Sequence, residues 1–205
     1  MTYDPNLDRR RSIRLKGYDY TQPGAYFITI VTFQREEIFG EVKDGKMICN
    51  ELGEIAREEW FKTAQLRPNI RLYDDEFVIM PNHGHGTLWI VGDDNMNTVP
   101  AIVGAQRRCA PTYDINHADP KTNARVVLPG SLGAIVRAYK SAVTYRINAL
   151  RNTRGVTVWQ RNYYEHIIHN EAEYKAIWNY INANPLRWED DQLHKSAPPN
   201  RFNRD

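Results

Sequence analysis

Cysteine is scarce in this chain of 205 residues, since Cys49 and Cys109 are the only two and lie outside any Cys-x-x-Cys pattern. Two distant cysteines predict neither a disulfide framework nor a thiolate zinc site, and they favour a reducing compartment. Long apolar runs are also missing, because no stretch approaches the roughly 18 residues of a membrane span. The first residues lack the charged and apolar regions of a signal peptide. We therefore expect a cytoplasmic protein without a membrane partner.

An excess of either charge is missing too, since 27 basic and 25 acidic residues leave a formal net charge of +2. That total does not indicate a nucleic-acid partner, but the distribution of the charges matters more. The segment 1–24 forms a basic arm interleaved with tyrosines. Such an arm can neutralise phosphates while its rings stack on bases, or it can be a solvated tail. Its cations are Arg9, Arg10, Arg11, Arg14 and Lys16.

Two histidines one residue apart, His83 and His85, lie between two apolar runs in residues 78–90. Side chains alternate along a strand, so both imidazoles are predicted to point to the same face. Imidazole is the commonest metal ligand among side chains, and two of them with a third polar group could hold a divalent ion with open positions. A polar edge strand with two solvated histidines gives the same short pattern.

A helix is predicted about a hundred residues downstream, over residues 170–184. Asn170 and Glu173 read as an N-cap and capping box, and Pro185 marks the end of the helix. Tyr180 and Asn184 are four residues apart, so a phenol and a carboxamide project together from one face. Alternatively, they are a core tyrosine and an asparagine that caps the helix end.

The remaining patterns predict one domain over residues 1–205, of class α+β, with an antiparallel sheet and helices packed on one side. Residues 93–129 are rich in Gly, Pro, Asn and Asp and are interpreted as a mobile insertion. Residues 188–205 form a polar tail, frayed or laid over the surface. Strands are expected at 25–33, 39–43, 46–49, 71–80, 83–91, 156–160 and 163–168, and further helices at 51–64 and 130–150.

The order of these blocks resembles the REP-associated tyrosine transposases, which are single-tyrosine transposases of the HUH nuclease superfamily. The similar segments are 10–20, 23–29, 72–90, 132–143, 158–168 and the helix ending at Asn184 and Pro185. The resemblance implies a ferredoxin-like sheet, with the histidines on a central strand and the tyrosine helix across the same face. The family usually has a bulky apolar residue where this chain has Gly84. Glycine there removes a core contact and weakens the strand by about 1 kcal/mol.

By this resemblance, His83, His85 and Asn184 are metal ligands for magnesium or manganese, and Tyr180 is the nucleophile; no organic cofactor is implied. The implied activity is nicking and joining of single-stranded DNA at hairpin-forming repeats through a 5′-phosphotyrosine intermediate. The protein would act at a prokaryotic nucleoid, as a monomer or homodimer. The expected DNA contacts are Arg9, Arg10, Arg11, Arg14, Lys16, Arg137, Lys140, Arg161 and His166.

Two other functions stay open on the residues alone. The chain could be a non-catalytic protein that binds DNA hairpins with the same fold. It could instead be a metal-dependent hydrolase that uses His83 and His85 with water as the nucleophile.

Overall fold

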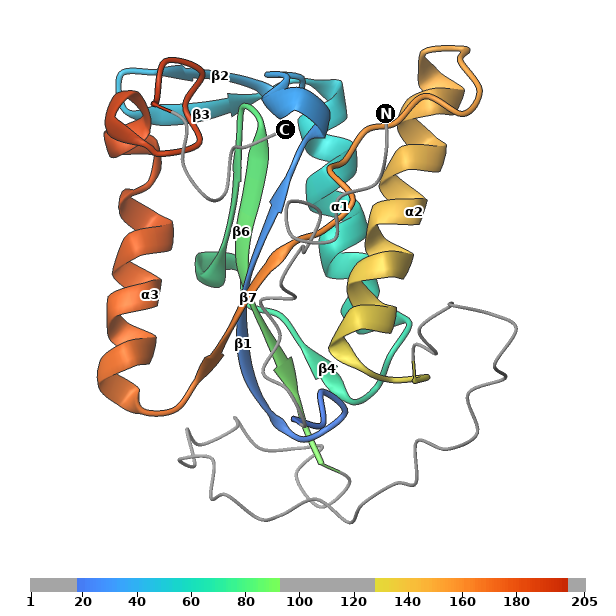
Figure 1. The fold of residues 1–205 in the computed structure, drawn as a ribbon, viewed down its shortest axis with the longest axis vertical. Coiled ribbons are helices and arrows are strands. Elements are labelled where there is room, and N and C mark those ends of the chain that lie inside the picture. The colour runs from blue at the N-terminus through green and yellow to red at the C-terminus, as the bar shows by residue number, and fades with distance from the viewer. Residues whose placement is uncertain (1–17, 93–127, 199–205) are drawn as a thin grey trace, which may run out of the picture.

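A computed structural model describes residues 18–92 and 128–198, and its centre is one antiparallel sheet (Figure 1). The strand order is β4-β6-β1-β7, and β5 also pairs with β6. The central strands are therefore β1 and β6, which pair along their full lengths. The expected α+β class with an antiparallel sheet is confirmed. The strands are β1 (Gly24–Val31), β4 (Ile70–Arg71), β5 (Phe77–Met80), β6 (His83–Ile90) and β7 (Tyr164–Ile168).

Among the described residues, three α-helices cover the sheet: α1 (Glu51–Gln65), α2 (Leu132–Leu150) and α3 (Glu171–Ala183). Figure 1 shows α1 and α2 on one side of the sheet and α3 on the other. Alternation along β1 explains the two layers, because Tyr26 and Ile28 pack in the core with α1 and α2, whereas Phe27 packs with Ile181 of α3. The expectation that the helices lie on one side thus holds for α1 and α2 only.

A hairpin of β2 (Gly40–Lys43) and β3 (Lys46–Cys49) lies beside the main sheet, as its turn residues predict. Asp44 and Gly45 both have positive φ angles, 51° and 70°. Two left-handed residues in a two-residue turn match the twist of the flanking strands.

The predicted strand 71–80 is interrupted. The short 3₁₀ helix η2 (Asp74–Glu76) separates β4 from β5. The acidic side chains there are used by other elements: Glu76 is buried and accepts a hydrogen bond from Trp89, and Asp75 accepts one from Trp178.

The predicted strand 156–160 is reduced to one isolated bridge between Thr32 and Trp159. Two backbone hydrogen bonds flank this bridge: Gln160 N–H donates to the Val31 carbonyl at 2.9 Å, and Phe33 N–H donates to the Val158 carbonyl at 2.8 Å. The carbonyls of residues 160, 161 and 162 accept hydrogen bonds from the Lys140 side chain, so the pairing does not extend beyond Gln160.

Residues 185–198, the described part of the chain beyond α3, pack on the body, where a frayed or surface-laid tail was expected. The 3₁₀ helix η5 (Pro185–Asp190) follows α3 directly, and Trp188, Asp191 and Leu193 are buried. The basic residues 9–16 and nearly all of the expected insertion lie outside the described residues. Within residues 18–92 and 128–198, no helix is long and apolar enough to cross a membrane.

Candidate metal and nucleophile site

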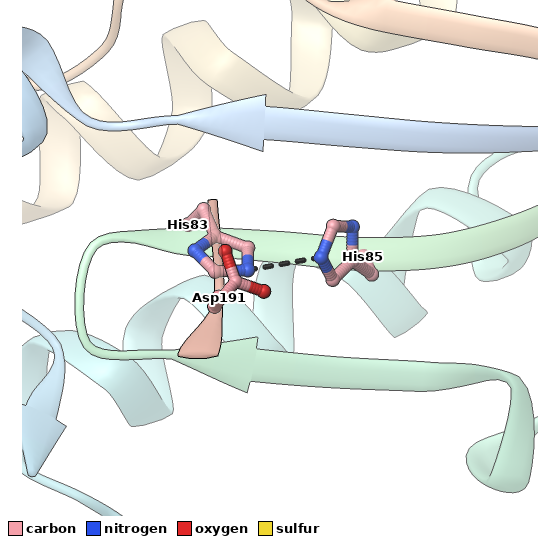
Figure 2. A group of neighbouring side chains, drawn as sticks. All are labelled: His83, His85 and Asp191. Atoms are coloured by element: carbon pink, nitrogen blue, oxygen red, sulfur yellow. Dashed lines mark hydrogen bonds between the residues drawn. The ribbon is translucent and has the colours of Figure 1, made fainter. Parts of the chain in front are cut away.

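His83 and His85 lie on the central strand β6 and point to the same face, as the alternation predicted. Both side chains are buried, with 0% and 2% of their surface exposed. Figure 2 shows the rings turned toward each other, and their Nε2 atoms are 2.9 Å apart. Two ring nitrogens are thereby brought to one point beneath α3 and the segment that follows it.

The outer nitrogen of each ring has a fixed partner. His83 Nδ1 is 2.8 Å from Asn82 Oδ1, and the Asn82 amide nitrogen donates to the carbonyls of Arg35 and Leu193. Those two bonds orient the amide so that its oxygen faces His83. Nδ1 of His83 therefore carries the proton, and its Nε2 presents a lone pair to the site.

The second ring is held by the strand pairing. Thr29 of β1 lies directly opposite His85, and its Oγ1 is 2.8 Å from His85 Nδ1. Phe27, two residues away on β1, stacks its ring on His85 with the centroids 5.5 Å apart. Outer contacts of this kind fix ring orientation in metal sites.

Both imidazoles are neutral at physiological pH. Burial lowers the pKa of His83 to about 3. Burial also lowers the pKa of His85 well below its usual value, and the charge that His83 would carry lowers it further. A neutral imidazole is the form that binds a metal ion.

Tyr180 reaches this pair from α3. Its hydroxyl is 3.1 Å from His85 Nε2, and its ring meets Phe27 edge-on with the centroids 6.0 Å apart. Burial and the charge of Asp191 raise the pKa of Tyr180, while the Asn184 amide lowers it. The phenol is therefore protonated at neutral pH. Tyr180 keeps 36% of its surface exposed, so it connects the buried histidines to solvent.

Helix α3 is docked on η2 by hydrogen bonds from its aromatic side chains. Glu76 accepts hydrogen bonds from the Tyr174 hydroxyl, at 2.5 Å, and from the Trp89 indole, at 2.7 Å. Asp75 accepts a third from the indole of Trp178 at 3.0 Å. Burial raises the pKa of Glu76, and the two hydrogen bonds it accepts lower it. These contacts set the rotation of α3 that directs Tyr180 toward His85.

Asn184 caps the C-terminal end of α3, and only 2% of its surface is exposed. Its amide nitrogen donates to Asp191 Oδ2 at 3.1 Å, and its Oδ1 is buried without a hydrogen-bond partner. A buried acceptor left in this way costs about 1–3 kcal/mol. The Asn184 amide also raises the pKa of His83, so it lies beside the imidazoles.

Asp191 joins the same cluster, although no sequence pattern predicts it. One carboxylate oxygen of Asp191 and one nitrogen from each of His83 and His85 all lie within 4.8 Å of one another (Figure 2). Asp191 was placed in a polar tail, and no motif or spacing connects it with the histidines. Only the turn of the chain after Asn184 brings it there.

These donors fit a divalent ion. Adjacent ligands of an octahedral ion with bonds of about 2.1 Å lie about 3 Å apart, close to the 2.9 Å between the two Nε2 atoms. A cation would also give the unpartnered Asn184 oxygen a partner. The structure therefore brings the three predicted ligands and the predicted nucleophile to one place.

On the opposite face of β6, directly behind the histidines, lie Gly84 and Gly86. A Cβ on Gly84 would lie 3.2 Å from Ile79 Cδ1, so its neighbours already fill the space that the bulky family residue would occupy. A Cβ on Gly86 would lie 2.7 Å from Trp60 and 2.8 Å from Phe77. Those two rings stack with centroids 4.7 Å apart. The core contact that Gly84 was expected to remove is thus replaced from β5.

The predicted DNA contacts have different surroundings. Lys140 Nζ donates to the carbonyls of residues 160, 161 and 162, and burial lowers the pKa of Lys140 to about 8. Its ammonium is used by the backbone, and the expected contact of Lys140 with DNA stays a prediction. Arg137 and Arg161 are exposed. His166 lies on β7, with Nε2 3.5 Å from a carboxylate oxygen of Glu173.

The chain is similar to one protein in sequence and to another in fold. No protein-family model matches the chain. An uncharacterized protein of Haemophilus influenzae is 38% identical over 192 residues, which cover 94% of this chain and 97% of that protein. The structure of a REP-associated tyrosine transposase bound to a REP hairpin is similar with a TM-score of 0.50 and 17% identity, over 85% of this chain and 72% of that one. The fold that the sequence resemblance implied is confirmed.

Proposed function

We propose that this chain nicks and rejoins single-stranded DNA through Tyr180. The chain belongs to one family with the Haemophilus influenzae protein, and it shares the fold of the REP-associated tyrosine transposase. One observation carries the proposal. The Tyr180 hydroxyl lies 3.1 Å from the Nε2 atom of a neutral His85, although the two residues are 95 positions apart in the chain. A phenol beside two neutral imidazoles and an unpartnered amide oxygen has the parts of a phosphoryl-transfer site.

His83, His85 and Asn184 would hold the divalent ion, which we propose to be magnesium or manganese. When bound, the ion polarises a phosphate oxygen and stabilises the negative charge of the transition state. Asn82 and Thr29 keep the inner nitrogens of the two rings turned to that position. Two histidine nitrogens and one amide oxygen do not distinguish magnesium from manganese. The ligands at the other coordination positions decide which of the two ions is bound.

Tyr180 Oη would attack the phosphorus of the scissile phosphodiester. The bond from phosphorus to the 3′ oxygen breaks as the bond to Tyr180 forms, so the product is a 5′-phosphotyrosine and a free 3′-hydroxyl. The phenol loses one proton and the departing 3′ oxygen gains one. A 3′-hydroxyl of a second strand can then reverse the reaction, and no external energy source is needed because the phosphodiester energy is kept in the covalent link.

Hairpin DNA is the proposed partner. The transposase of the comparison structure is bound to a REP hairpin. In this chain, the exposed Arg137 and Arg161 and the half-exposed His166 are proposed as contacts, together with the basic residues 9–16. Deleting residues 1–16 should flatten the dependence of binding on salt by about 0.7 to 0.9 in logarithmic slope per lost phosphate contact. An unchanged slope would make the arm a solvated tail.

The test is to incubate the protein with a single-stranded hairpin oligonucleotide and manganese and to run the products on a denaturing gel. The wild type should form a covalent protein-DNA adduct. His83→Ala and His85→Ala should lose the adduct and keep most of the DNA affinity, because phosphate contacts come mainly from basic side chains.

The same gel separates the other two functions. Cleaved DNA without an adduct would indicate a hydrolase that uses water. Binding with neither cleavage nor an adduct would indicate a non-catalytic hairpin-binding protein.

A further inference from the structure

Asp191 is a buried carboxylate at the site, and it is not one of the predicted site residues. Its Oδ1 accepts the backbone N–H of Leu193 at 2.6 Å, and its Oδ2 accepts the amide nitrogen of Asn184 at 3.1 Å. The first bond fixes the carboxylate against the chain that follows η5. The second makes Asp191 the partner of a proposed metal ligand.

The bond from Asn184 to Asp191 decides which end of the Asn184 amide faces the site. An amide has a donor end and an acceptor end, and only the acceptor end can bind a cation. With Nδ2 on Asp191, the amide directs Oδ1 away from the carboxylate, and this oxygen is left buried without a partner. Asp191 therefore holds Asn184 in the orientation that a metal ligand needs.

Asp191 also supplies charge. An imidazole binds a metal ion in its neutral form, and the Asn184 amide carries no charge, so the three proposed ligands supply no negative charge themselves. Within the part of the chain that the structure describes, Asp191 is the one carboxylate grouped with these imidazoles. A carboxylate is a hard oxygen donor, which suits magnesium and manganese better than it suits softer ions.

From these contacts we propose that Asp191 is a positioning residue of the metal site, which orients Asn184 and supplies the negative charge that holds a divalent cation. The proposal rests on the metal site of the proposed function, but it concerns metal binding and not DNA cleavage. Partners of metal ligands typically change metal affinity by about 10- to 100-fold when they are removed.

The experiment measures Mn²⁺ affinity by electron paramagnetic resonance of the free ion, without DNA. Asp191→Asn removes the charge at nearly unchanged volume, and Asp191→Ala removes both the charge and the acceptor. Asp190→Asn is the matched control, because Asp190 is the exposed neighbour and the change in total charge is the same. We expect Asp191→Asn to bind Mn²⁺ about 10-fold more weakly than the control or worse, and Asp191→Ala more weakly still.

A Mn²⁺ affinity of Asp191→Asn within twofold of the Asp190→Asn control would overturn the proposal, as would a wild type that binds no Mn²⁺ at millimolar concentration. Circular dichroism in EDTA reports whether each variant is folded. If Asp191→Ala does not fold, Asp191→Asn decides. A wild type that binds Mn²⁺ without forming a DNA adduct would contradict the proposed function alone, since the ratio of affinities still tests the role of Asp191.

Discussion

Mild acid should destabilise the metal-free protein, because the buried histidines must stay neutral in the folded state. The perturbation is a fall in pH from 7.5 to 5.0, in EDTA. In the unfolded chain His83 binds a proton near its usual pKa of 6.5, whereas in the fold burial lowers the pKa of His83 to about 3. At pH 5.0 the unfolded state therefore holds a proton that the folded state lacks, and the stabilisation that His83 gives is partly lost.

The size of the loss follows from those two values. The contribution of His83 is fully present above pH 6.5 and falls as the pH drops toward 3, by about 1.4 kcal/mol per pH unit. Between pH 7.5 and 5.0 the free energy of unfolding should fall by about 2 kcal/mol from His83 alone. His85, whose pKa is also lowered well below its usual value, adds to the loss in the same direction.

Urea unfolding followed by tryptophan fluorescence at the two pH values measures this loss. The matched control is His83→Gln, which removes the titrating ring. Its free energy of unfolding should fall by about 2 kcal/mol less than that of the wild type over the same interval, which separates His83 from the carboxylates that also titrate. Equal losses in the two proteins would refute the assignment of His83 as a buried neutral ring.

Two further predictions concern the surroundings of the site. Gly86→Ala should lower the free energy of unfolding by about 1–3 kcal/mol, because its Cβ would lie 2.7 Å from the ring of Trp60. Gly84→Ala, which meets only the end of a flexible side chain, should cost less in the same urea experiment. Lys140→Ala should lower the melting temperature and leave the salt dependence of DNA binding unchanged, whereas Arg161→Ala should reduce that slope by about 0.7 to 0.9. A reduced salt dependence of DNA binding in Lys140→Ala would show that Lys140 contacts DNA.

Local signals predicted α3 well. The Asn170 side chain accepts the backbone N–H of Glu173 as an N-cap, and the helix ends at Asn184 before Pro185. Both features depend on residues within one or two turns, so the sequence contains them. The interrupted strand 71–80 differs, because the use of Asp75 and Glu76 by α3 and Trp89 depends on packing between distant segments.

In the site, too, some features follow from local patterns and others depend on contacts between distant segments. Alternation in a strand was enough to place His83 and His85 on one face, but the approach of Tyr180 came from the family resemblance. Thr29 reaches His85 only through the register of β1 on β6, and Asp191 only through the turn after α3. Neither register nor that turn is encoded in a short pattern. The polar residues around the ligands therefore became visible only in the structure.

The most direct test of the central claim is to identify the residue that carries the DNA. The covalent adduct formed with hairpin DNA and manganese is digested and its modified peptide is mapped by mass spectrometry. We predict attachment at Tyr180, and loss of the adduct in Tyr180→Phe with Mn²⁺ and hairpin affinity retained, because only the hydroxyl is removed. Attachment at Tyr163, Tyr164 or Tyr174, or an adduct that persists in Tyr180→Phe, would contradict the account.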